Sequence, residues 1–520
     1  MPLPDLRLGI DVGGTNTDAV VLGADDRVVA KAKVATSGDV TSGIRRAIAA
    51  VIEGMDDAPA RITHAMLGTT HATNAILERR DLRRVVVIRV GAPATLAVPP
   101  LAGWPAELSE VVSAGVAVVG GGFQFDGREL ETLDLDAVER FVQSVADVAE
   151  AAAIVCVFSS VSTDHELRVA GAIRGVLGEV PISMSHEVGT VGLLERENAT
   201  VLNAALEGIA RRVADALTAA LAEHGLTPVV YFAQNDGTLM GLDYALEHPV
   251  LTIGSGPANS IRGAAHLSGA SEALVVDVGG TSTDVGALVK GFPRDSTAPT
   301  EIGGITSNFR MPDLISIRLG GGTVVTRSNG FPAGLVEESV GPGLSERALV
   351  FGGSTPTLTD AAVAGGRALL GDPRRVRTAS SDLARALALA DARLADAVER
   401  AKTGRADVTV VAVGGAGFLV PDGLRGVCEV VRPEHAEVAN AVGAALANVG
   451  GRSDRVVSLR GGEREAAIER ACHAARMDAV RAGADPGRTE IVEIEEFPLT
   501  YLAEPAVRLR VRAAGPLGDL

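Results

Sequence analysis

The sequence predicts an α/β protein built from two related halves, with a helical connecting region and a small C-terminal α+β appendage. Three observations lead to this fold class. The motif Asp-Val-Gly-Gly-Thr-x-Thr-Asp occurs at residues 11–18 and again at 277–284. Strand-like apolar runs alternate with helix-like segments after the first copy, as in α/β domains. Finally, a chain of 520 residues is too long for one ordinary hydrophobic core.

The first half is assigned to residues 1–182. Apolar runs separated by turns at 6–34 predict three antiparallel strands in meander order. Apolar residues at helical spacing in 41–55 predict a helix, and the segment 61–90 reads as strand, Gly-Thr loop, helix and strand. The remaining expected elements continue this unit as two strands and two helices, near 112–119, 134–150, 153–158 and 166–177.

The rest of the chain divides into a connecting region, a second half and an appendage. Residues 183–270 are dominated by helical patterns, including a long helix expected at 195–225. The second copy of the motif opens the second half, 271–452, which is rich in strand signals and carries an amphipathic helix at 381–401. The more highly charged residues 453–520 predict a helix followed by two strands.

The composition favours a protein with small ligands over one that binds nucleic acid. The formal net charge is -17, whereas sequence-independent nucleic-acid binding depends on Lys and Arg that neutralise phosphates. The three cysteines are far apart, and Cys156 lies in an apolar run that predicts a buried structural thiol. The N-terminus lacks a basic segment followed by a long apolar one, so we expect no signal peptide, no membrane span and a cytoplasmic location.

The two repeated motifs are the first candidates for a functional site. Each apolar run suits a strand that ends in Asp, the Gly pair suits a tight hairpin, and Thr hydroxyls with loop amides form an anion-binding concavity. A single loop of this kind would more readily be an ordinary β-turn, but its duplication favours a polyphosphate site. Asp11 and Asp277 can hold Mg²⁺ through water. The predicted phosphate-binding residues are Gly13, Gly14, Thr15, Asn16, Gly279, Gly280, Thr281 and Ser282.

Two further segments are candidate binding loops. The turn Gly414-Gly415-Ala416 follows a Val-rich strand and predicts a surface for adenine or ribose, with a plain strand-to-helix turn as the alternative. Hydroxyl, imidazole and amide groups gather at one helix start and predict a substrate-facing surface, with a simple helix cap as the alternative. These predicted substrate residues are Thr69, Thr70, His71 and Asn74. Weaker candidates, which simple caps or turns also explain, are Asp360, His186 and Glu187.

These pieces match the pattern of the actin, Hsp70 and sugar kinase superfamily, and the chain resembles its hydantoinase A and 5-oxoprolinase family. The resemblance is spread over most of the chain. The segments that carry it, in the expected order, are GIDVGGTNTDAVV, LGTTHATNAILERR, ERENATVLNAAL, TIGSGPANS, VVDVGGTSTDVG, DLISIRLGGGT, PTLTDA and VAVGGAGFLVPD.

The resemblance implies two ribonuclease H-like domains that enclose ATP and Mg²⁺. It also implies an ATP-dependent hydrolase or hydrolase subunit that phosphorylates the oxygen of a cyclic amide or other small carbonyl substrate, with a companion hydrolase subunit and an oligomeric assembly. In this prediction Asp11 and Asp277 position the metal, and Asp18 or Asp284 orients the attacking oxygen or a water. The alternatives are a small-molecule kinase of the same superfamily and a non-catalytic ATP-dependent switch or activator.

Three positions of one loop depart from the family pattern. Ile315 stands where the family commonly has His, and Arg318-Leu319 replace Gly-Ala in the same loop. A metal or substrate ligand provided by that His is therefore absent from this chain. The nucleotide loops consequently support ATP binding more directly than they support hydrolysis of hydantoin or oxoproline.

Overall fold

The repeated motif opens two β-sheets of the same topology. In the computed structural model, β1 and β2 pair antiparallel, β2 and β3 do the same, β4 lies parallel beside β1, and β9 lies parallel beside β4. These strands are β1 (Leu6–Val12), β2 (Asn16–Leu22), β3 (Val28–Ala35), β4 (Ile62–Thr69) and β9 (Val229–Ala233). The described residues are 5–36, 40–55, 59–188, 191–296, 299–308, 311–326, 334–378, 380–458, 464–499 and 506–518.

The second sheet repeats each of these pairings. Its strand order is β13-β12-β11-β19-β20, with the first three strands antiparallel and the last two parallel to β11. Asp11 lies opposite Asp18 in the first hairpin, and Asp277 lies opposite Asp284 in the second. The duplication predicted from the motif is thus confirmed in topology and register. The strands are β11 (Glu272–Val278), β12 (Thr283–Val289), β13 (Phe292–Pro293), β19 (Val408–Val413) and β20 (Val427–Val431).

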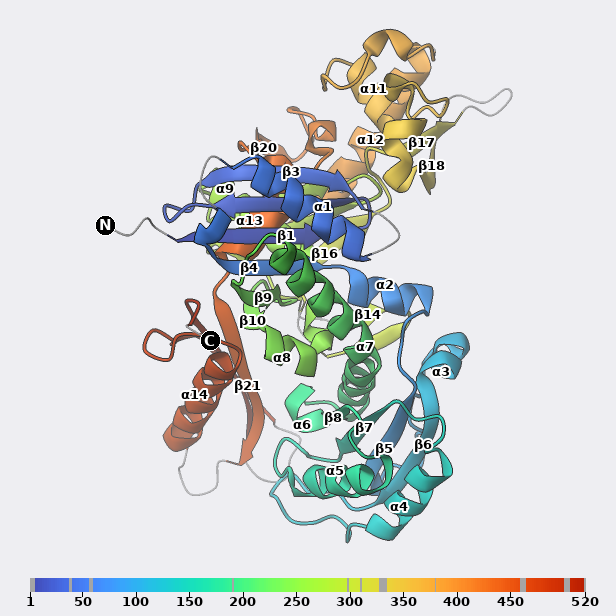
Figure 1. The fold of residues 1–520 in the computed structure, drawn as a ribbon, viewed down its shortest axis with the longest axis vertical. Helices are drawn as coiled ribbons and strands as arrows, with labels where there is room; N and C mark the ends of the chain where they lie inside the picture. Colours follow the sequence, from blue (N-terminus) through green and yellow to red (C-terminus); the bar gives the residue numbers. More distant parts are fainter. Residues whose placement is uncertain are drawn as a thin grey trace.

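Two helices carry the chain between the sheets. The chain passes to the second sheet through α9 (Ser255–Ser268) and returns through α13 (Ala439–Leu446), and the two helices pack against each other between the halves (Figure 1). Glycines make this crossing very close, because a Cβ atom on Gly263 would lie 1.8 Å from the Ala439 carbonyl oxygen. A Cβ atom on Gly443 would lie 1.9 Å from the Asn259 carbonyl oxygen.

The strands that follow β4 form a separate parallel sheet in the order β6-β5-β7-β8. The expected strands near 112–119 and 153–158 therefore exist but do not extend the first sheet. The edge of β4 is instead occupied by β9, a strand within the region predicted to be mainly helical, so β5 has no edge to join. The elements of this unit are β5 (Val85–Ala92), β6 (Ser113–Gly120), β7 (Ala151–Cys156), β8 (Ile182–Met184), α3 (Ala106–Val112), α4 (Leu135–Ser144) and α5 (Asp164–Leu177).

A buried ion pair fixes this unit to the rest of the molecule. Arg89 of β5 donates from Nε and a terminal nitrogen to the two carboxylate oxygens of Glu197, at 2.7 Å each. Glu197 belongs to α7 (Leu193–Glu223), the long helix expected from the sequence, and both side chains are fully buried. Such a two-pronged contact sets the orientation of the sheet as well as its position.

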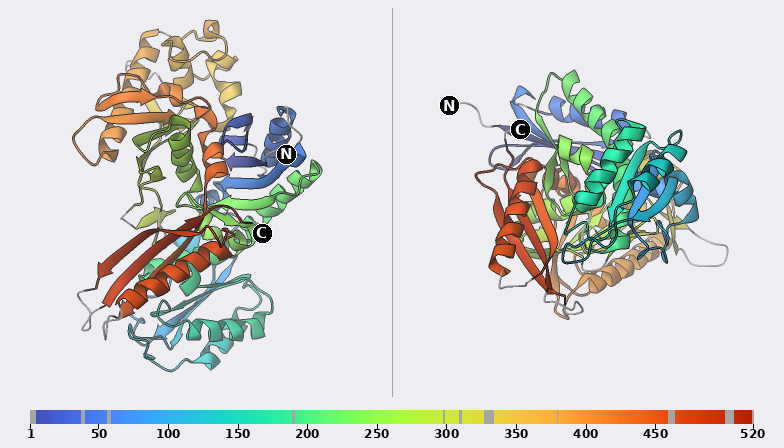
Figure 2. Two further views of the ribbon diagram at one scale, coloured as in Figure 1. Left: turned by 90° about the vertical axis from the view of Figure 1, so that its left-hand side faces the viewer. Right: turned by 90° about the horizontal axis from the view of Figure 1, so that it is seen from below.

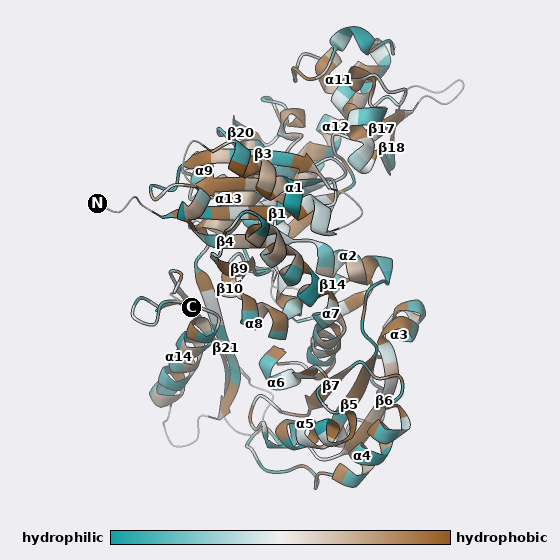
Figure 3. Ribbon diagram, viewed as in Figure 1, coloured by the Kyte–Doolittle hydropathy of each residue, from teal (hydrophilic) through white to brown (hydrophobic). Residues whose placement is uncertain are grey.

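The C-terminal residues continue the first sheet. β21 (Val449–Ser458) pairs with β10 (Leu239–Gly241), and the full order is β22-β23-β21-β10-β9-β4-β1-β2-β3. The expected helix and two strands are present as α14 (Arg464–Arg481), β22 (Glu490–Pro498) and β23 (Ala506–Gly515). The left view of Figure 2 shows this long sheet with α14 against it, and Figure 3 shows α14 as mainly hydrophilic beside the more hydrophobic strands.

The remaining elements cover the two halves. Of the helices in the described part of the chain, none is long and apolar enough to cross a membrane. Beside the first sheet lie α1 (Val40–Glu53) and α8 (Leu242–Glu247), whereas α6 (Ser185–Val188) lies beside β7 and β8 of the separate sheet. Helix α2 (His71–Glu78) follows β4 and contacts α7. Those of the second half are β14 (Thr300–Ile302), β15 (Ile305–Ser307), β16 (Leu314–Ile317), β17 (Thr323–Thr326), β18 (Gly334–Ser339), α10 (Leu344–Arg347), α11 (Leu358–Ala364) and α12 (Ser380–Ala401).

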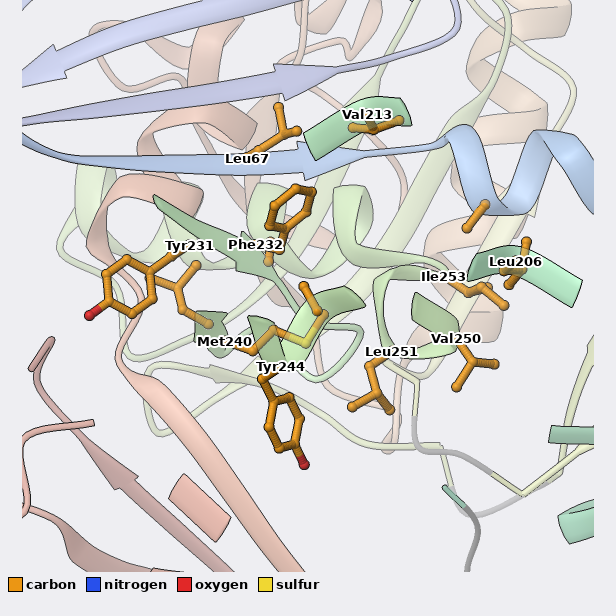
Figure 4. Close-up of a cluster of buried hydrophobic side chains, with 14 of the residues drawn as sticks. Leu67, Leu206, Val213, Tyr231, Phe232, Met240, Tyr244, Val250, Leu251 and Ile253 are labelled. Carbon is orange, nitrogen blue, oxygen red and sulfur yellow. The ribbon is translucent and has the colours of Figure 1, made fainter. Parts of the chain in front are cut away.

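A hydrophobic cluster packs against the C-terminal end of β4. Phe232 of β9 lies between Leu67 of β4 and Met240 of β10, and α7 closes the cluster with Leu206 and Val213 (Figure 4). Because these side chains are buried, the loop that follows β4 starts from a rigid base. That loop lies at the site described next.

Candidate active site

The two Gly-Gly-Thr loops face each other across one cleft with an empty volume of about 1010 Å³. The loops approach closely, since a Cβ atom on Gly280 would lie 3.0 Å from Cγ2 of Thr15. Nearly all residues predicted for catalysis and phosphate binding therefore line a single cavity. They are Asp11, Gly13, Gly14, Thr15, Asn16, Asp18, Asp277, Gly279, Gly280, Thr281, Ser282, Asp284, Gly414 and Gly415.

Each strand-end aspartate lies against a glycine at the end of the neighbouring parallel strand, Gly68 within β4 and Gly414 directly after β19. A Cβ atom on Gly68 would lie 2.4 Å from Oδ1 of Asp11, and one on Gly414 would lie 2.2 Å from Oδ1 of Asp277. Any side chain at either glycine would push the carboxylate out of place. The repeated topology thus builds the same pocket for a carboxylate twice.

The crossing helices orient these carboxylates. Asn440 of α13 donates its amide to Oδ2 of Asp11 at 3.1 Å, and Ser260 of α9 donates its hydroxyl to Oδ2 of Asp277 at 2.5 Å. In the described part of the chain, Oδ1 of Asp11 and both amide atoms of Asn259 are buried without a hydrogen-bond partner. Buried polar atoms of this kind indicate room for a further polar ligand.

Burial raises the pKa of all four aspartates in the cleft. Burial, followed by the charges of Asp18 and Asp277, raises the pKa of Asp11 to about 7. Burial raises the pKa of Asp284 to about 6 even though Ser316 donates a hydrogen bond to it. The pKa values of Asp18 and Asp277 are raised as well, again chiefly by burial. A cation in the cleft would stabilise the charged carboxylates.

The second aspartate of the motif has different hydrogen-bond partners in the two halves. Asp18 accepts from Lys33 Nζ at 2.6 and 2.7 Å, so its charge is offset by a cation on β3. Asp284 accepts only from the Ser316 hydroxyl among the described residues. Asp284 is consequently the carboxylate more available to a ligand in the cleft.

Because the pKa of Asp11 is raised, we expect the free energy of unfolding to depend on pH in the protein without nucleotide or metal. Because the pKa is above its usual value, the folded state holds the proton more tightly, and stability falls as the pH rises from about 4 through 7. We expect Asp11→Asn to be more stable than the wild type at pH 8 by roughly 1–4 kcal/mol, and the difference to vanish near pH 4. Urea unfolding in metal-free buffer at both pH values measures it. A stability difference that is constant with pH would contradict this assignment.

The Gly-rich turn after β19 separates the main cleft from a second cavity of about 1020 Å³. Gly414, Gly415 and Glu437 line both cavities, whereas Arg367, Phe418 and Arg432 line only the second. Ala416 was predicted to contact the nucleotide but lines neither cavity. It is buried, and its N–H donates to the Val278 carbonyl, which holds the turn against β11.

Of the four residues predicted for substrate binding, three line two different cavities and Asn74 lines neither. Thr70 lines the main cleft, and Asn74 donates to its hydroxyl at 3.4 Å. Thr69 and His71 instead line a small apolar pocket of about 340 Å³ together with Phe232. Burial lowers the pKa of His71 to about 4, so the ring is neutral at physiological pH. Thr70 occupies the N-cap of α2, but its hydroxyl donates to the Val12 carbonyl rather than capping the helix.

Several other candidates have structural explanations. Asp360 forms a capping box with Thr357 and accepts the Val350 N–H, so its carboxylate is fully engaged. Cys156 is buried, and burial raises the pKa of its thiol, in agreement with the predicted structural role. Ile315 lies in β16 opposite Val285, away from the lining of the cleft.

Sequence reasoning missed several residues at the cleft outside the two motifs, of which Lys33, Ser260 and Asn440 donate hydrogen bonds to the aspartates. They lie on β3, α9, α13 and the turn before α13, outside both motifs. One signal was available, since the segment TIGSGPANS that carries the family resemblance contains both Asn259 and Ser260. The missed residues are Lys33, Asn259, Ser260, Glu437 and Asn440.

The duplicated topology and the four aspartates define a two-lobed α/β protein with a polar, carboxylate-lined cleft between its lobes. The chain belongs to the hydantoinase/oxoprolinase family, as the motifs predicted. The model for the hydantoinase/oxoprolinase N-terminal region matches residues 7–177, and the hydantoinase/oxoprolinase model matches residues 196–372.

Two curated relatives are similar over most of this chain. The caprolactamase subunit alpha of Pseudomonas jessenii is 28% identical over 403 residues, which cover 73% of this chain and 58% of the relative. The acetophenone carboxylase gamma subunit of Aromatoleum aromaticum is 26% identical over 476 residues, which cover 81% of this chain and 64% of the relative. The chain therefore spans about three fifths of the length of these relatives.

Two solved structures share the fold along the whole chain. The ATP-dependent caprolactamase from Pseudomonas jessenii has a TM-score of 0.76 at 19% identity, and covers 99% of this chain and 89% of its own. A nucleotide-free acetone carboxylase has a TM-score of 0.72 at 18% identity, and covers 99% of this chain and 88% of its own. The mixed α/β architecture predicted from the sequence is thus confirmed.

Proposed function

We propose that the chain is an ATP-dependent enzyme, or a subunit of one, that activates a cyclic amide or other small carbonyl compound by phosphoryl transfer. The observation that carries this proposal is the meeting of two Gly-Gly-Thr loops and four carboxylates at one cleft. The similar caprolactamase is ATP-dependent, which agrees with a nucleotide at this place. The strand order shared by the two sheets supports the view that each half is a ribonuclease H-like unit.

In this proposal the nucleotide spans the two adjoining cavities. The loops Gly13–Asn16 and Gly279–Ser282 hold the phosphates with backbone amides and hydroxyls, because glycine permits close approach of the backbone. The nucleoside lies in the cavity bordered by Gly414 and Gly415, with Phe418 and Arg432 on its wall. Ala416 does not line either cavity in this proposal, but its hydrogen bond to the Val278 carbonyl holds the turn in place.

The cleft fits Mg²⁺ held through water and phosphate. Mg²⁺ usually keeps several waters and takes one or two carboxylates plus phosphate oxygens. Asp11, with its unpartnered Oδ1, and Asp277 supply such carboxylates. In the ranges that the structure describes, no group of three His, Cys, Asp or Glu side chains holds a metal by itself, so phosphate and water complete the set. When bound, the ion would neutralise the charge that develops on the phosphate oxygens.

The proposed chemical step turns a poor leaving group into a good one. The substrate carbonyl oxygen attacks the γ-phosphorus of ATP, a new P–O bond forms, the bond to the β-phosphate oxygen breaks, and ADP leaves. With a lactam, water then adds to the activated carbon and the C–N bond breaks, which opens the ring and leaves an acyl phosphate and a free amine. A second water hydrolyses the acyl phosphate to phosphate and the carboxylic acid. Asp284, which has no cation partner among the described residues, orients the attacking group, and Thr70 on the cleft wall contacts the substrate. A companion subunit would complete the reaction.

An ATPase screen tests the proposal. The full chain is assayed with lactams, hydantoins, oxoproline and ketones, with and without the product of an adjacent reading frame. We expect phosphate release that depends on one carbonyl class and yields a ring-opened acid. Phosphate retained on the product would instead show a small-molecule kinase. ATP binding without turnover under every condition would show a switch protein.

Carboxylation is a second outcome favoured by the similarity to acetophenone carboxylase gamma subunit. The same activated oxygen on a ketone would lead to carbon–carbon bond formation with bicarbonate as the second substrate. Isotope-labelled bicarbonate in the ketone arm of the screen distinguishes the two, since only carboxylation retains the labelled carbon in the product.

A further inference from the structure

An apolar pocket with an empty volume of about 340 Å³ lies across the Thr69-Thr70-His71 turn from the main cleft. Thr70 lines the main cleft, whereas both of its neighbours line this pocket, which we name the His71 pocket. Its other walls come from α7, α8, β9 and residues 249–252. Figure 4 shows Phe232, which lines the pocket, beside the C-terminal end of β4. The pocket therefore adjoins the proposed active site without sharing a lining residue with it.

The same turn is attached to the loop Gly13–Asn16. The N–H and the hydroxyl of Thr70 both donate to the Val12 carbonyl, at 3.2 and 3.1 Å. Val12 directly precedes this loop along the chain. Ser255 of α9 donates its hydroxyl to the Thr69 carbonyl at 3.4 Å, which holds the turn from the other half. A compound in the His71 pocket is consequently separated from the proposed phosphate loop by one turn of the chain.

The contacts of Thr69 determine the tautomer of the His71 ring. Burial lowers the pKa of His71 to about 4, so the ring is neutral at physiological pH. The Thr69 hydroxyl oxygen accepts the His71 N–H at 3.2 Å and contacts Nδ1 of the ring at 2.5 Å. Because this hydroxyl has no other partner among the described residues, it donates its own proton to Nδ1. The ring therefore carries its proton on Nε2.

The walls leave one hydrogen-bond donor for a ligand. The hydroxyl of Thr252 donates to the Pro249 carbonyl at 2.8 Å, and that of Thr69 is engaged with His71. Nε2 of His71 forms no hydrogen bond within the part of the chain that the structure describes. Of the described residues that line the pocket, none carries a charge at neutral pH. The His71 pocket consequently suits an uncharged, largely apolar molecule with one hydrogen-bond acceptor.

We propose that the His71 pocket binds the substrate of the adjoining cleft and selects an uncharged cyclic carbonyl compound, such as a simple lactam, over a charged one. The ring methylene groups contact the apolar walls, and the carbonyl oxygen accepts a hydrogen bond from Nε2 of His71. A carbonyl oxygen has two lone pairs, so the second stays free for attack on phosphorus. The identification of the ligand as substrate rests on the function proposed above, whereas the binding itself requires no nucleotide.

The charge of the ligand is the property that these walls discriminate. Pyrrolidinone and oxoproline share one five-membered lactam ring, and oxoproline carries an additional carboxylate. That carboxylate would lose its hydration in the pocket and meet no cation on the lining. The two compounds therefore form a matched pair for the test.

A ligand-observed NMR titration of the full chain without nucleotide tests this site. The probes are pyrrolidinone, piperidone and oxoproline at neutral pH. We expect pyrrolidinone to bind roughly tenfold or more tightly than oxoproline, because only oxoproline has to bury a charge. Piperidone has one more methylene group than pyrrolidinone and should bind about fourfold more tightly, the gain for burying that group.

Two variants connect the binding to the pocket. His71→Leu keeps an apolar wall but removes the donor, and should weaken pyrrolidinone binding by about tenfold. Ala210→Leu fills the pocket from α7 and should abolish lactam binding. The matched controls are Ala219→Leu, at an exposed position of the same helix, and His473→Leu, at an exposed histidine of α14. Both controls should bind lactams as the wild type does, and circular dichroism checks that each variant is folded.

The proposal is overturned if no lactam binds saturably, if oxoproline binds as tightly as pyrrolidinone, or if folded His71→Leu and Ala210→Leu both bind like the wild type. These results are distinct from the outcome of the ATPase screen. Lactam-dependent turnover with unchanged binding in both variants would remove this site and keep the proposed function. Lactam binding that both variants lose, with no stimulation of turnover by any carbonyl compound, would keep the binding site and contradict the proposed function.

Discussion

Asp277→Asn is expected to lower ATP turnover by about 10²–10³-fold or more, on the scale of losing one preorganised electrostatic contact to the reacting phosphate. The substitution preserves size and the hydrogen bond from Ser260, but removes the negative charge that would position the metal. The other carboxylate of β11, Glu272, lies at the opposite end of the strand and does not replace it. Steady-state phosphate release with the activating substrate measures the effect.

Asp136→Asn is the matched control for this prediction. Asp136 is exposed in the first turn of α4, in the separate sheet unit, and its loss should leave turnover unchanged. Unaltered turnover in Asp277→Asn would show that the charge of this carboxylate has no role in the reaction. Nucleotide binding measured in parallel shows whether the loss lies in binding or in transfer.

Gly263→Ala is expected to damage both stability and activity. Its Cβ atom would lie 1.8 Å from the Ala439 carbonyl oxygen, so α9 and α13 must separate. Overpacking of this kind costs about 3 kcal/mol of the free energy of unfolding. The same shift would move Ser260 and Asn440, which orient Asp277 and Asp11. Chemical unfolding and ATP turnover at a temperature where the variant remains folded measure the two effects.

Gly175→Ala provides the comparison for a glycine in an open helical position. Gly175 lies in α5, is exposed, and a Cβ atom there would meet nothing within 4 Å. Alanine should stabilise the protein by about 0.5–1 kcal/mol, because it reduces the freedom of the unfolded chain. Equal stability changes in Gly175→Ala and Gly263→Ala would contradict the close helix crossing.

The regular elements were largely predictable because their signals are local. The strand meander at the N-terminus, the helix α7 and the amphipathic helix α12 all appear where periodicity placed them. The assignment of strands to sheets was less accurate. β5 and β7 form their own sheet, while β9 takes the place beside β4, since strand pairing depends on which edges remain free in three dimensions.

The candidate site was predictable only where the sequence repeats itself. Because the motif occurs twice, Asp11 and Asp277 could be recognised as equivalent residues, and both line the cleft. The difference between Asp18, paired with Lys33, and Asp284, paired with Ser316, was not predictable, because each partner lies on another strand. Thr69 and Thr70 are adjacent in sequence yet line different cavities, since successive side chains around a turn point in different directions.

The sequence by itself determined the family, the duplication and the chemical character of the two loops, because motifs record what a backbone segment and its side chains can do locally. The tertiary structure alone decided that the loops share one cleft and that glycine contacts between α9 and α13 set the crossing of the halves. It also decided that the C-terminal strands extend the first sheet. These features depend on contacts between residues distant along the chain, which no local pattern encodes.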